Sequence, residues 1–199
     1  MGAGLGGGSS DAAVTLMVLE RLTGDRLALP ARLELASRLG SDVPLFLFGG
    51  RVLGCGRGEE VYPLADLPSH PCLIVFPGFS VSTSEAYAAI GLRLTEQKEN
   101  RTINVLGKRP PFPLEAWGPA ENDFEMFVFA RWPELAKVKS QLIRAGAETA
   151  SLTGSGSALY AVFKSAQQLN RVATRMPAGW KVYKVRTLSR AAYQRRLYV

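Results

Sequence analysis

The stretch GAGLGGGSSDAA, residues 2–13, decides how the N-terminal part of this chain is expected to fold. Five of its first seven residues are glycine, and two serines, an acid and a helix-favouring run follow them. Glycine lets main-chain atoms approach a ligand without side-chain clashes, and the amides at a helix N-terminus carry partial positive charge. The stretch therefore predicts a cradle for an anion such as a phosphate, with a flexible glycine-rich tail as the alternative.

The residues that follow the glycines predict helices and then a hairpin. Ser9 or Ser10 is expected to cap a helix that carries Asp11 in its first turn and ends at Gly24. A second helix is expected from Pro30 to just before Gly40, because proline is favoured in a first turn. The polar turn GSDVP leads into an apolar run, and RVLGCGRGEEVYPL, residues 51–64, is typical of a hairpin.

Beyond a proline-rich linker at 63–71, strands alternate with helices. Four strands are expected, within 72–78 and at about 148–152, 157–163 and 180–187. Helices are expected at 84–94, 133–145 and 165–176. This order is typical of a ferredoxin-like split βαβ unit with an insertion. Residues 95–121 are polar and rich in proline, which predicts an irregular segment.

Composition argues against several classes of protein. No stretch approaches the roughly 18–20 apolar residues of a membrane span, and the N-terminus lacks the pattern of a signal peptide. Cys55 and Cys72 are too few for a disulfide framework, which favours a reducing, cytoplasmic setting. A single histidine, His70, argues against a metal site built from histidines.

The positive charge of the chain is concentrated in its C-terminal part. The formal net charge is +7; residues 1–70 carry six basic and eight acidic side chains, and residues 71–199 carry eighteen and nine. Such a surface could attract nucleic acid or an anionic small molecule. Because the basic residues are scattered and no RNA-binding motif is present, we expect a small-molecule ligand, with neither nucleic acid nor membrane as partner.

Two familiar phosphate-binding motifs fit the glycine stretch poorly. A Walker loop ends in Gly-Lys-Ser/Thr, and the stretch contains no lysine. Gly2, Gly4 and Gly7 satisfy the spacing G-x-G-x-x-G of dinucleotide-binding folds, but any run of glycines does so. The strand that should precede that fingerprint is missing, as is its acidic partner at the end of a second strand.

A third phosphate-binding motif fits the glycine stretch better, through a resemblance to a known family. GAGLGGGSSDAA resembles the phosphate-binding motif of the GHMP small-molecule kinase superfamily, which includes galactokinase, homoserine kinase and mevalonate kinase. Within it, residues 4–13 and LGSDVPLFLFGG, residues 39–50, are most similar to the branch that acts on 4-diphosphocytidyl-2-C-methyl-D-erythritol. NDFE at 122–125 and TGSGSALYAVF at 153–163 resemble later motifs of that branch and occur in the same order.

The resemblance implies an α+β, GHMP kinase-like fold of two domains. Residues 1–68 would be a truncated ribosomal-S5-like N-terminal domain that binds ATP, and residues 69–199 a ferredoxin-like C-terminal domain. The implied activity uses ATP and Mg²⁺ to phosphorylate a hydroxyl of a cytidine-diphosphate-linked polyol in non-mevalonate isoprenoid biosynthesis. The alternatives are a homoserine- or mevalonate-type kinase of the same superfamily, and a non-catalytic nucleotide-binding remnant.

The same resemblance implies roles for single residues. Asp42, whose carboxylate in a tight turn could take a proton from a hydroxyl, matches the catalytic base. The acceptor substrate is assigned to Thr83, to Tyr87 as an aromatic on the cytosine, and to the turn Gly154, Ser155 and Gly156. The phosphate cradle comprises Gly2, Ala3, Gly4, Leu5, Gly6, Gly7, Gly8, Ser9 and Ser10, with Ser10 also as a ligand of Mg²⁺.

Several of these residues could instead have a purely structural role. Asp42 could merely cap a turn, Tyr87 could belong to the core, and TGSGS could be a plain hairpin turn. Asn122 and Asp123 are expected to form a helix cap and the first turn after it rather than to bind a ligand.

The sequence differs from the superfamily in the region before the glycine stretch. There the superfamily has a segment that supplies strands, a lysine beside the catalytic aspartate and a second aromatic for the cytosine, whereas here Met1 stands alone. We therefore expect residues 1–68 to expose apolar helix faces and strand edges. We also expect the 199-residue chain to be poorly soluble or inactive by itself. The sequence predicts no oligomeric state.

Overall fold

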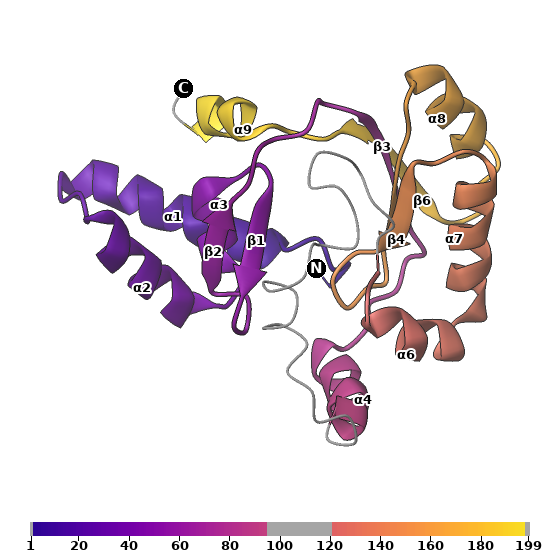
Figure 1. The fold of residues 1–199 in the computed structure, drawn as a ribbon, viewed down its shortest axis with the longest axis horizontal. Helices are drawn as coiled ribbons and strands as arrows, with labels where there is room; N and C mark the ends of the chain where they lie inside the picture. Colours follow the sequence, from indigo (N-terminus) through magenta and orange to yellow (C-terminus); the bar gives the residue numbers. More distant parts are fainter. Residues whose placement is uncertain (1, 95–120, 198–199) are drawn as a thin grey trace. The chain divides into compact units, whose positions relative to one another are not determined.

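A computed structural model describes residues 2–94 and 121–197 and contains two compact units (Figure 1). The sheet unit comprises residues 1–5 and 69–187, and the helical unit comprises residues 6–68 and 188–199. Against the expected ranges 1–68 and 69–199, the structure groups both chain ends with the other unit. The segment expected to be irregular, 95–121, falls outside the described residues except for Glu121.

The helical unit is built from short helices and a hairpin around a small core. Its elements are α1 (Gly7–Thr23), α2 (Leu29–Leu39), α3 (Val43–Phe48), β1 (Val52–Cys55), β2 (Glu60–Pro63) and α9 (Arg190–Leu197). Gly24 ends α1 with a φ of +78°, and β1 pairs antiparallel with β2, as the sequence predicts. The buried core consists of Ala13, Leu16, Ala36 and Val43.

Helix α1 leaves an apolar face exposed, as expected from the sequence. Leu22 is 77% exposed, and Val18 and Leu19 are also open to solvent. The buried polar residue of this helix is Glu20, whose Oε1 lies 3.0 Å from Arg32 Nε on α2 and accepts the N–H of Leu27. This ion pair ties α2 to α1, where few apolar side chains are buried.

Helix α9 was not predicted from the sequence, and contacts with distant residues hold it in the helical unit. The hydroxyl of Tyr193 donates to the carbonyl oxygen of Phe46 at 2.7 Å. Arg190 uses its backbone N–H to reach Asp66 Oδ2 at 2.6 Å and its guanidinium to reach the carbonyl oxygen of Arg51 at 2.7 Å. These bonds explain why a segment without an apolar pattern is ordered.

The sheet unit has the ferredoxin-like topology that the sequence predicts. Its four strands are β3 (Pro71–Phe76), β4 (Thr149–Leu152), β5 (Leu159–Val162) and β6 (Lys181–Arg186), in the order β4-β5-β3-β6 with antiparallel neighbours throughout. The helices among the described residues of this unit are α4 (Thr83–Leu94), α6 (Phe124–Arg131), α7 (Pro133–Arg144) and α8 (Ala166–Ala173). The chain is thus an α+β protein, with a split βαβ unit in its C-terminal part.

Helices α7 and α8 cover the sheet, and α6 packs against both α7 and α4 (Figure 1). Leu135 and Leu142 of α7 and Leu169 of α8 share a core with the buried β3 residues Leu73 and Val75. The helix that packs on the sheet after β3 is therefore α7. The segment that contains α4 and α6 is the insertion into the split βαβ order.

Candidate functional site

The two units divide the glycine stretch. Residues 1–5 pack in the sheet unit, and Gly6 starts the run into α1 of the helical unit. The candidate residues therefore fall into two groups, one in each unit.

In the sheet unit, the start of the glycine stretch packs against the turn of residues 153–157. Thr153 Oγ1 donates to the carbonyl oxygen of Gly4 at 2.8 Å, and the N–H of Ala158 donates to that of Ala3 at 3.2 Å. Gly4 has a φ of +78°, and a Cβ on it would lie 1.9 Å from the carbonyl oxygen of Thr153. Only glycine fits there. Two motifs separated by about 150 residues are thus brought together.

The turn also contacts the start of α4. Ser155 is buried, and its Oγ lies 3.0 Å from Oγ1 of Thr83. Gly154 and Gly156 have φ values of +54° and +92°, and a Cβ on Gly154 would lie 3.0 Å from the carbonyl oxygen of Gly4. The candidate acceptor residues Thr83, Gly154, Ser155 and Gly156 therefore form one group. TGSGS does more than join two strands, because it bonds to both α4 and the glycine stretch.

Tyr87 lies on the exposed side of α4. Its side chain is 61% exposed, so the alternative that it belongs to the core is wrong. The ring meets Phe124 edge-on, with 4.9 Å between centroids and an interplanar angle of 87°. An aromatic face left open in this way can stack on a planar base.

In the helical unit, α1 begins without a side-chain cap, so the expectation that Ser9 or Ser10 caps the helix is wrong. The cap is Gly6, whose φ of +67° turns the chain into the helix early. As a result Asp11 lies beyond the first turn, again unlike the prediction. The first bond of the helix runs from the N–H of Ser10 to the carbonyl oxygen of Gly6 at 2.9 Å. The amides of Gly7, Gly8 and Ser9 precede it and make no i→i−4 bond.

Space is open around this helix start. Gly7 and Gly8 are exposed, and a Cβ on either would meet no atom within 4 Å, while Ser9 and Ser10 are half-buried. A Cβ on Gly6, in contrast, would lie 2.8 Å from the ring of Phe46 on α3. An anion can therefore approach the amides of a long helix whose dipole favours negative charge.

Asp42 is exposed and stands directly before α3 in the same unit. Its carboxylate caps no amide of that helix, so the alternative of a capping aspartate gains no support. Val43, the next residue, is buried in the core shared with α1 and α2, which fixes the backbone that carries the carboxylate. An exposed carboxylate on a fixed turn is suited to accept a proton.

Within the parts that the structure describes, no group of three or more His, Cys, Asp or Glu side chains is placed to hold a metal ion. Across those same residues, every helix is too short or too polar to cross a membrane.

Sequence comparison matches two regions of the chain to one family. Residues 1–50 match the GHMP kinases N terminal domain, and residues 115–182 match the GHMP kinases C terminal region. The chain belongs to the GHMP kinase family. The expected fold class and the resemblance noted from its motifs are thereby confirmed.

Curated relatives of this GHMP kinase chain carry the same name. A 4-diphosphocytidyl-2-C-methyl-D-erythritol kinase of Solibacter usitatus is 41% identical over 98% of this chain and 62% of its own length. One from Thermodesulfovibrio yellowstonii is 38% identical over 83% of this chain and 59% of its own length. The chain thus spans about three fifths of the length of the curated relatives it matches.

Solved structures agree with this placement. A crystal structure of 4-(cytidine 5'-diphospho)-2C-methyl-D-erythritol kinase superimposes with a TM-score of 0.69 at 33% identity, covering 94% of this chain and 66% of that one. Homoserine kinase from Cytophaga hutchinsonii shares the fold, with a TM-score of 0.58 at 17% identity, covering 95% of this chain and 67% of that one.

Proposed function

We propose that this chain carries the phosphate-binding, proton-accepting and acceptor-binding elements of an ATP-dependent kinase. Its acceptor would be a hydroxyl of 4-diphosphocytidyl-2-C-methyl-D-erythritol, in the non-mevalonate route to isoprenoid precursors. Curated relatives with that name support the acceptor. The proposal of a kinase depends on the start of α1. This helix terminus is capped by a glycine and has open space around its first amides.

The nucleotide phosphates are assigned to the helical unit. The amides of Gly7, Gly8 and Ser9 would donate to phosphate oxygens, and the helix dipole would add to their attraction. Mg²⁺ fits this arrangement as an ion that arrives with the nucleotide, because it keeps several waters and binds few protein ligands beside phosphate. The hydroxyl of Ser10 would be such a ligand.

Asp42 is assigned the proton. ATP supplies the phosphoryl group, and the transfer depends chiefly on position and on neutralised charge. Asp42 would accept the proton of the acceptor hydroxyl at one of its carboxylate oxygens as that hydroxyl attacks. Its exposure and its fixed backbone support this role.

The acceptor is assigned to the sheet unit. The exposed ring of Tyr87 would stack on the cytosine, and Thr83 together with residues 154–156 would bind the polar part of the molecule. The hydrogen bond between Thr83 and Ser155 supports this grouping, because it places helix α4 and the turn within direct contact.

Two other functions remain candidates on specific grounds. Homoserine- and mevalonate-type kinases share the fold at low identity, which leaves the acceptor open to test. A nucleotide-binding protein without catalysis is the second candidate, since the chain spans about three fifths of the length of the curated relatives it matches.

Nucleotide binding and turnover, measured side by side on the purified chain, separate these functions. Binding of MgATP is followed by calorimetry, and ADP release is followed with 4-diphosphocytidyl-2-C-methyl-D-erythritol, homoserine or mevalonate as acceptor. A kinase releases ADP with the first acceptor alone, whereas a remnant binds MgATP and releases none. A chain that neither binds MgATP nor releases ADP contradicts the proposal.

The variant Asp42→Asn tests the base. In a protein that carries this chain within the full length of its curated relatives, we expect kcat to fall by about 10²–10⁴-fold with little change in the Kd for ATP, because the amide cannot accept the proton. Asp66→Asn is not a suitable control, since Asp66 holds Arg190; Asp25→Asn, at an exposed site after α1, serves instead. If Asp42→Asn turns over at the parent rate, Asp42 is not the base.

A further inference from the structure

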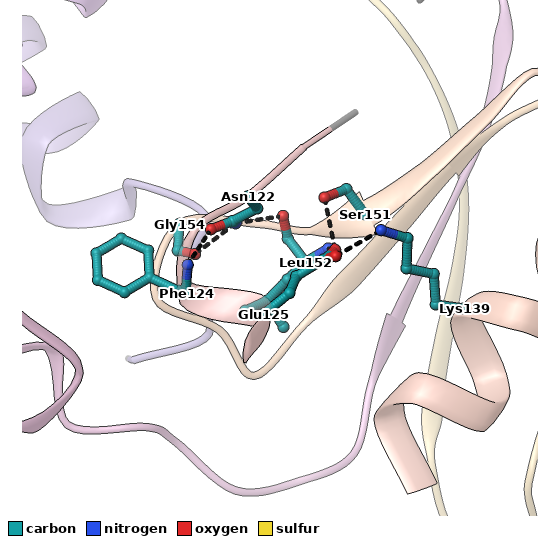
Figure 2. Close-up of polar contacts among 7 residues, drawn as sticks. All are labelled: Asn122, Phe124, Glu125, Lys139, Ser151, Leu152 and Gly154. Carbon is teal, nitrogen blue, oxygen red and sulfur yellow. Dashed lines mark hydrogen bonds and ion pairs between the residues drawn. The ribbon is translucent and has the colours of Figure 1, made fainter. Parts of the chain in front are cut away.

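Asn122 makes hydrogen bonds with three backbone groups, two of them at the end of β4 and in the 153–157 turn and one at the start of α6 (Figure 2). Its Nδ2 donates to the carbonyl oxygen of Leu152 at 2.9 Å and to that of Gly154 at 2.9 Å. Its Oδ1 accepts the N–H of Phe124 at 3.0 Å, which is the capping role expected from the sequence. The side chain thus does more than cap α6, because both of its N–H donors are directed to the strand end and the turn.

Glu125 fixes the same strand end from one turn further along (Figure 2). Its Oε1 accepts the N–H of Leu152 at 3.0 Å and the hydroxyl of Ser151 at 2.8 Å, and its Oε2 pairs with Lys139 Nζ at 2.5 Å. Both members of this ion pair are largely buried, with exposed side-chain fractions of 15% and 22%. A charge-assisted network of this kind is stronger than neutral hydrogen bonds and rigid in geometry.

These contacts satisfy backbone groups at the outer edge of the sheet, where the residues of β4 are buried. β4 is the outer strand in the order β4-β5-β3-β6, and the outward backbone groups of an edge strand need partners. At Leu152 the N–H bonds to Glu125 and the carbonyl bonds to Asn122, so side chains replace the missing strand. The turn begins at the next residue, and its glycines would otherwise leave it conformationally free.

We infer that Asn122 is a positioning residue that sets the conformation of the 153–157 turn, with Glu125 as its support. The inference rests on the proposed function only in assigning that turn to the acceptor. The same side chain orders the start of α6, where Phe124 contacts Tyr87. One asparagine therefore ties together the turn and the aromatic that are both assigned to the acceptor.

Two substitutions at Asn122 separate the role of its N–H donors from the role of its oxygen as a cap of α6. Asn122→Asp and Asn122→Ser keep an oxygen that can accept the N–H of Phe124, but neither can donate to both carbonyls. Asp123→Asn is the matched control, because Asp123 is the exposed neighbour whose side chain caps no amide. Each variant is made in the full 199-residue chain.

Amide hydrogen exchange, followed by NMR, reports the turn directly. The amides of Thr153, Gly156 and Ala158 are hydrogen-bonded around the turn, and that of Phe163 is bonded to Pro71 beyond it. We expect exchange at the first three to rise by roughly 10- to 100-fold in both Asn122 variants, with Phe163 and the Asp123→Asn control unchanged. If all four amides change together, or none does, the inference is wrong.

Kinetics on the same variants test the link to the acceptor. We expect the KM for the cytidine-diphosphate-linked acceptor to rise by about tenfold or more while the KM for ATP stays the same, since the turn is assigned to the acceptor alone. If the unaltered chain neither binds MgATP nor shows kinase activity, the proposed function fails, yet the exchange result still decides whether Asn122 sets the turn.

Discussion

At the scale of single residues, Gly4 and Gly7 come from the same glycine run but meet different surroundings. A Cβ on Gly4 would lie 1.9 Å from the carbonyl oxygen of Thr153 and 3.0 Å from Gly156 N, at a φ of +78°. We expect Gly4→Ala to lower the free energy of unfolding by about 1–3 kcal/mol, through backbone strain and lost contacts with the turn. Urea denaturation followed by fluorescence measures this loss.

Gly7→Ala is the control, because its Cβ would meet nothing within 4 Å. Its free energy of unfolding, followed by circular dichroism at 222 nm because Gly7 lies in the helical unit, should stay within about 0.5 kcal/mol of the parent, since the site is open. Equal stability of the two variants would show that the start of the glycine stretch does not pack on the turn.

The sequence identifies candidate residues by type but not by contact. Glycines and serines before a helix, and an aspartate in a tight turn, point to phosphate chemistry on local grounds. The contacts of Gly4 with Thr153 and of Asn122 with Gly154 join residues 149 and 32 positions apart. A local sequence pattern does not show which distant residues meet. Asn122 could therefore be predicted as a helix cap but not as a residue that hydrogen-bonds to the turn.

At the scale of elements, strand β3 can be examined through its cysteine. Cys72 is buried between β5 and β6, and burial raises the pKa of its thiol to about 11. In a Cys55→Ser variant, we expect alkylation of Cys72 at pH 8 to be at least about 100-fold slower in the folded chain than in urea. Mass spectrometry of timed samples measures it. Equal rates in both states would contradict the burial of β3.

The same thiol predicts how stability changes in alkaline solution. Its pKa is higher in the folded state than in the unfolded state, so the folded state holds the proton more tightly. The resulting stability is complete below the unfolded pKa, near 8.5, and is lost as the pH rises through about 11. Burial likewise raises the pKa of Tyr160, which acts in the same direction.

Element boundaries show which physical signals the sequence holds. Pro30, Gly24 and Gly40 predict the ends of α1 and α2 because their backbone preferences act locally. The run VPLFLF is too short for its periodicity to distinguish a helix from a strand, and it forms α3. α9 has no buried residue at all among those described, and its bonds to Phe46 and Asp66 come from tertiary structure.

At the scale of the whole molecule, the two units differ in how much apolar surface they bury. Among the described residues, the core of the sheet unit contains fifteen buried apolar side chains and that of the helical unit four. Because burial of apolar surface is the main favourable term in folding, the helical unit should be the less stable one. The exposed face of α1 adds nothing to its stability.

The three tryptophans allow this difference to be measured without labels. They occur at positions 117, 132 and 180, so none falls in residues 6–68 or 188–199 of the helical unit. Fluorescence therefore follows the sheet unit, whereas circular dichroism at 222 nm follows the helices of both. We expect dichroism to show a first transition at a urea concentration about 1 M or more below the fluorescence midpoint.

MgATP should move that first transition to a higher urea concentration if the start of α1 binds phosphate, since a ligand stabilises the state that binds it. Coincident transitions by both probes would show that the small core of the helical unit does not unfold independently, and the chain would then be one cooperative structure.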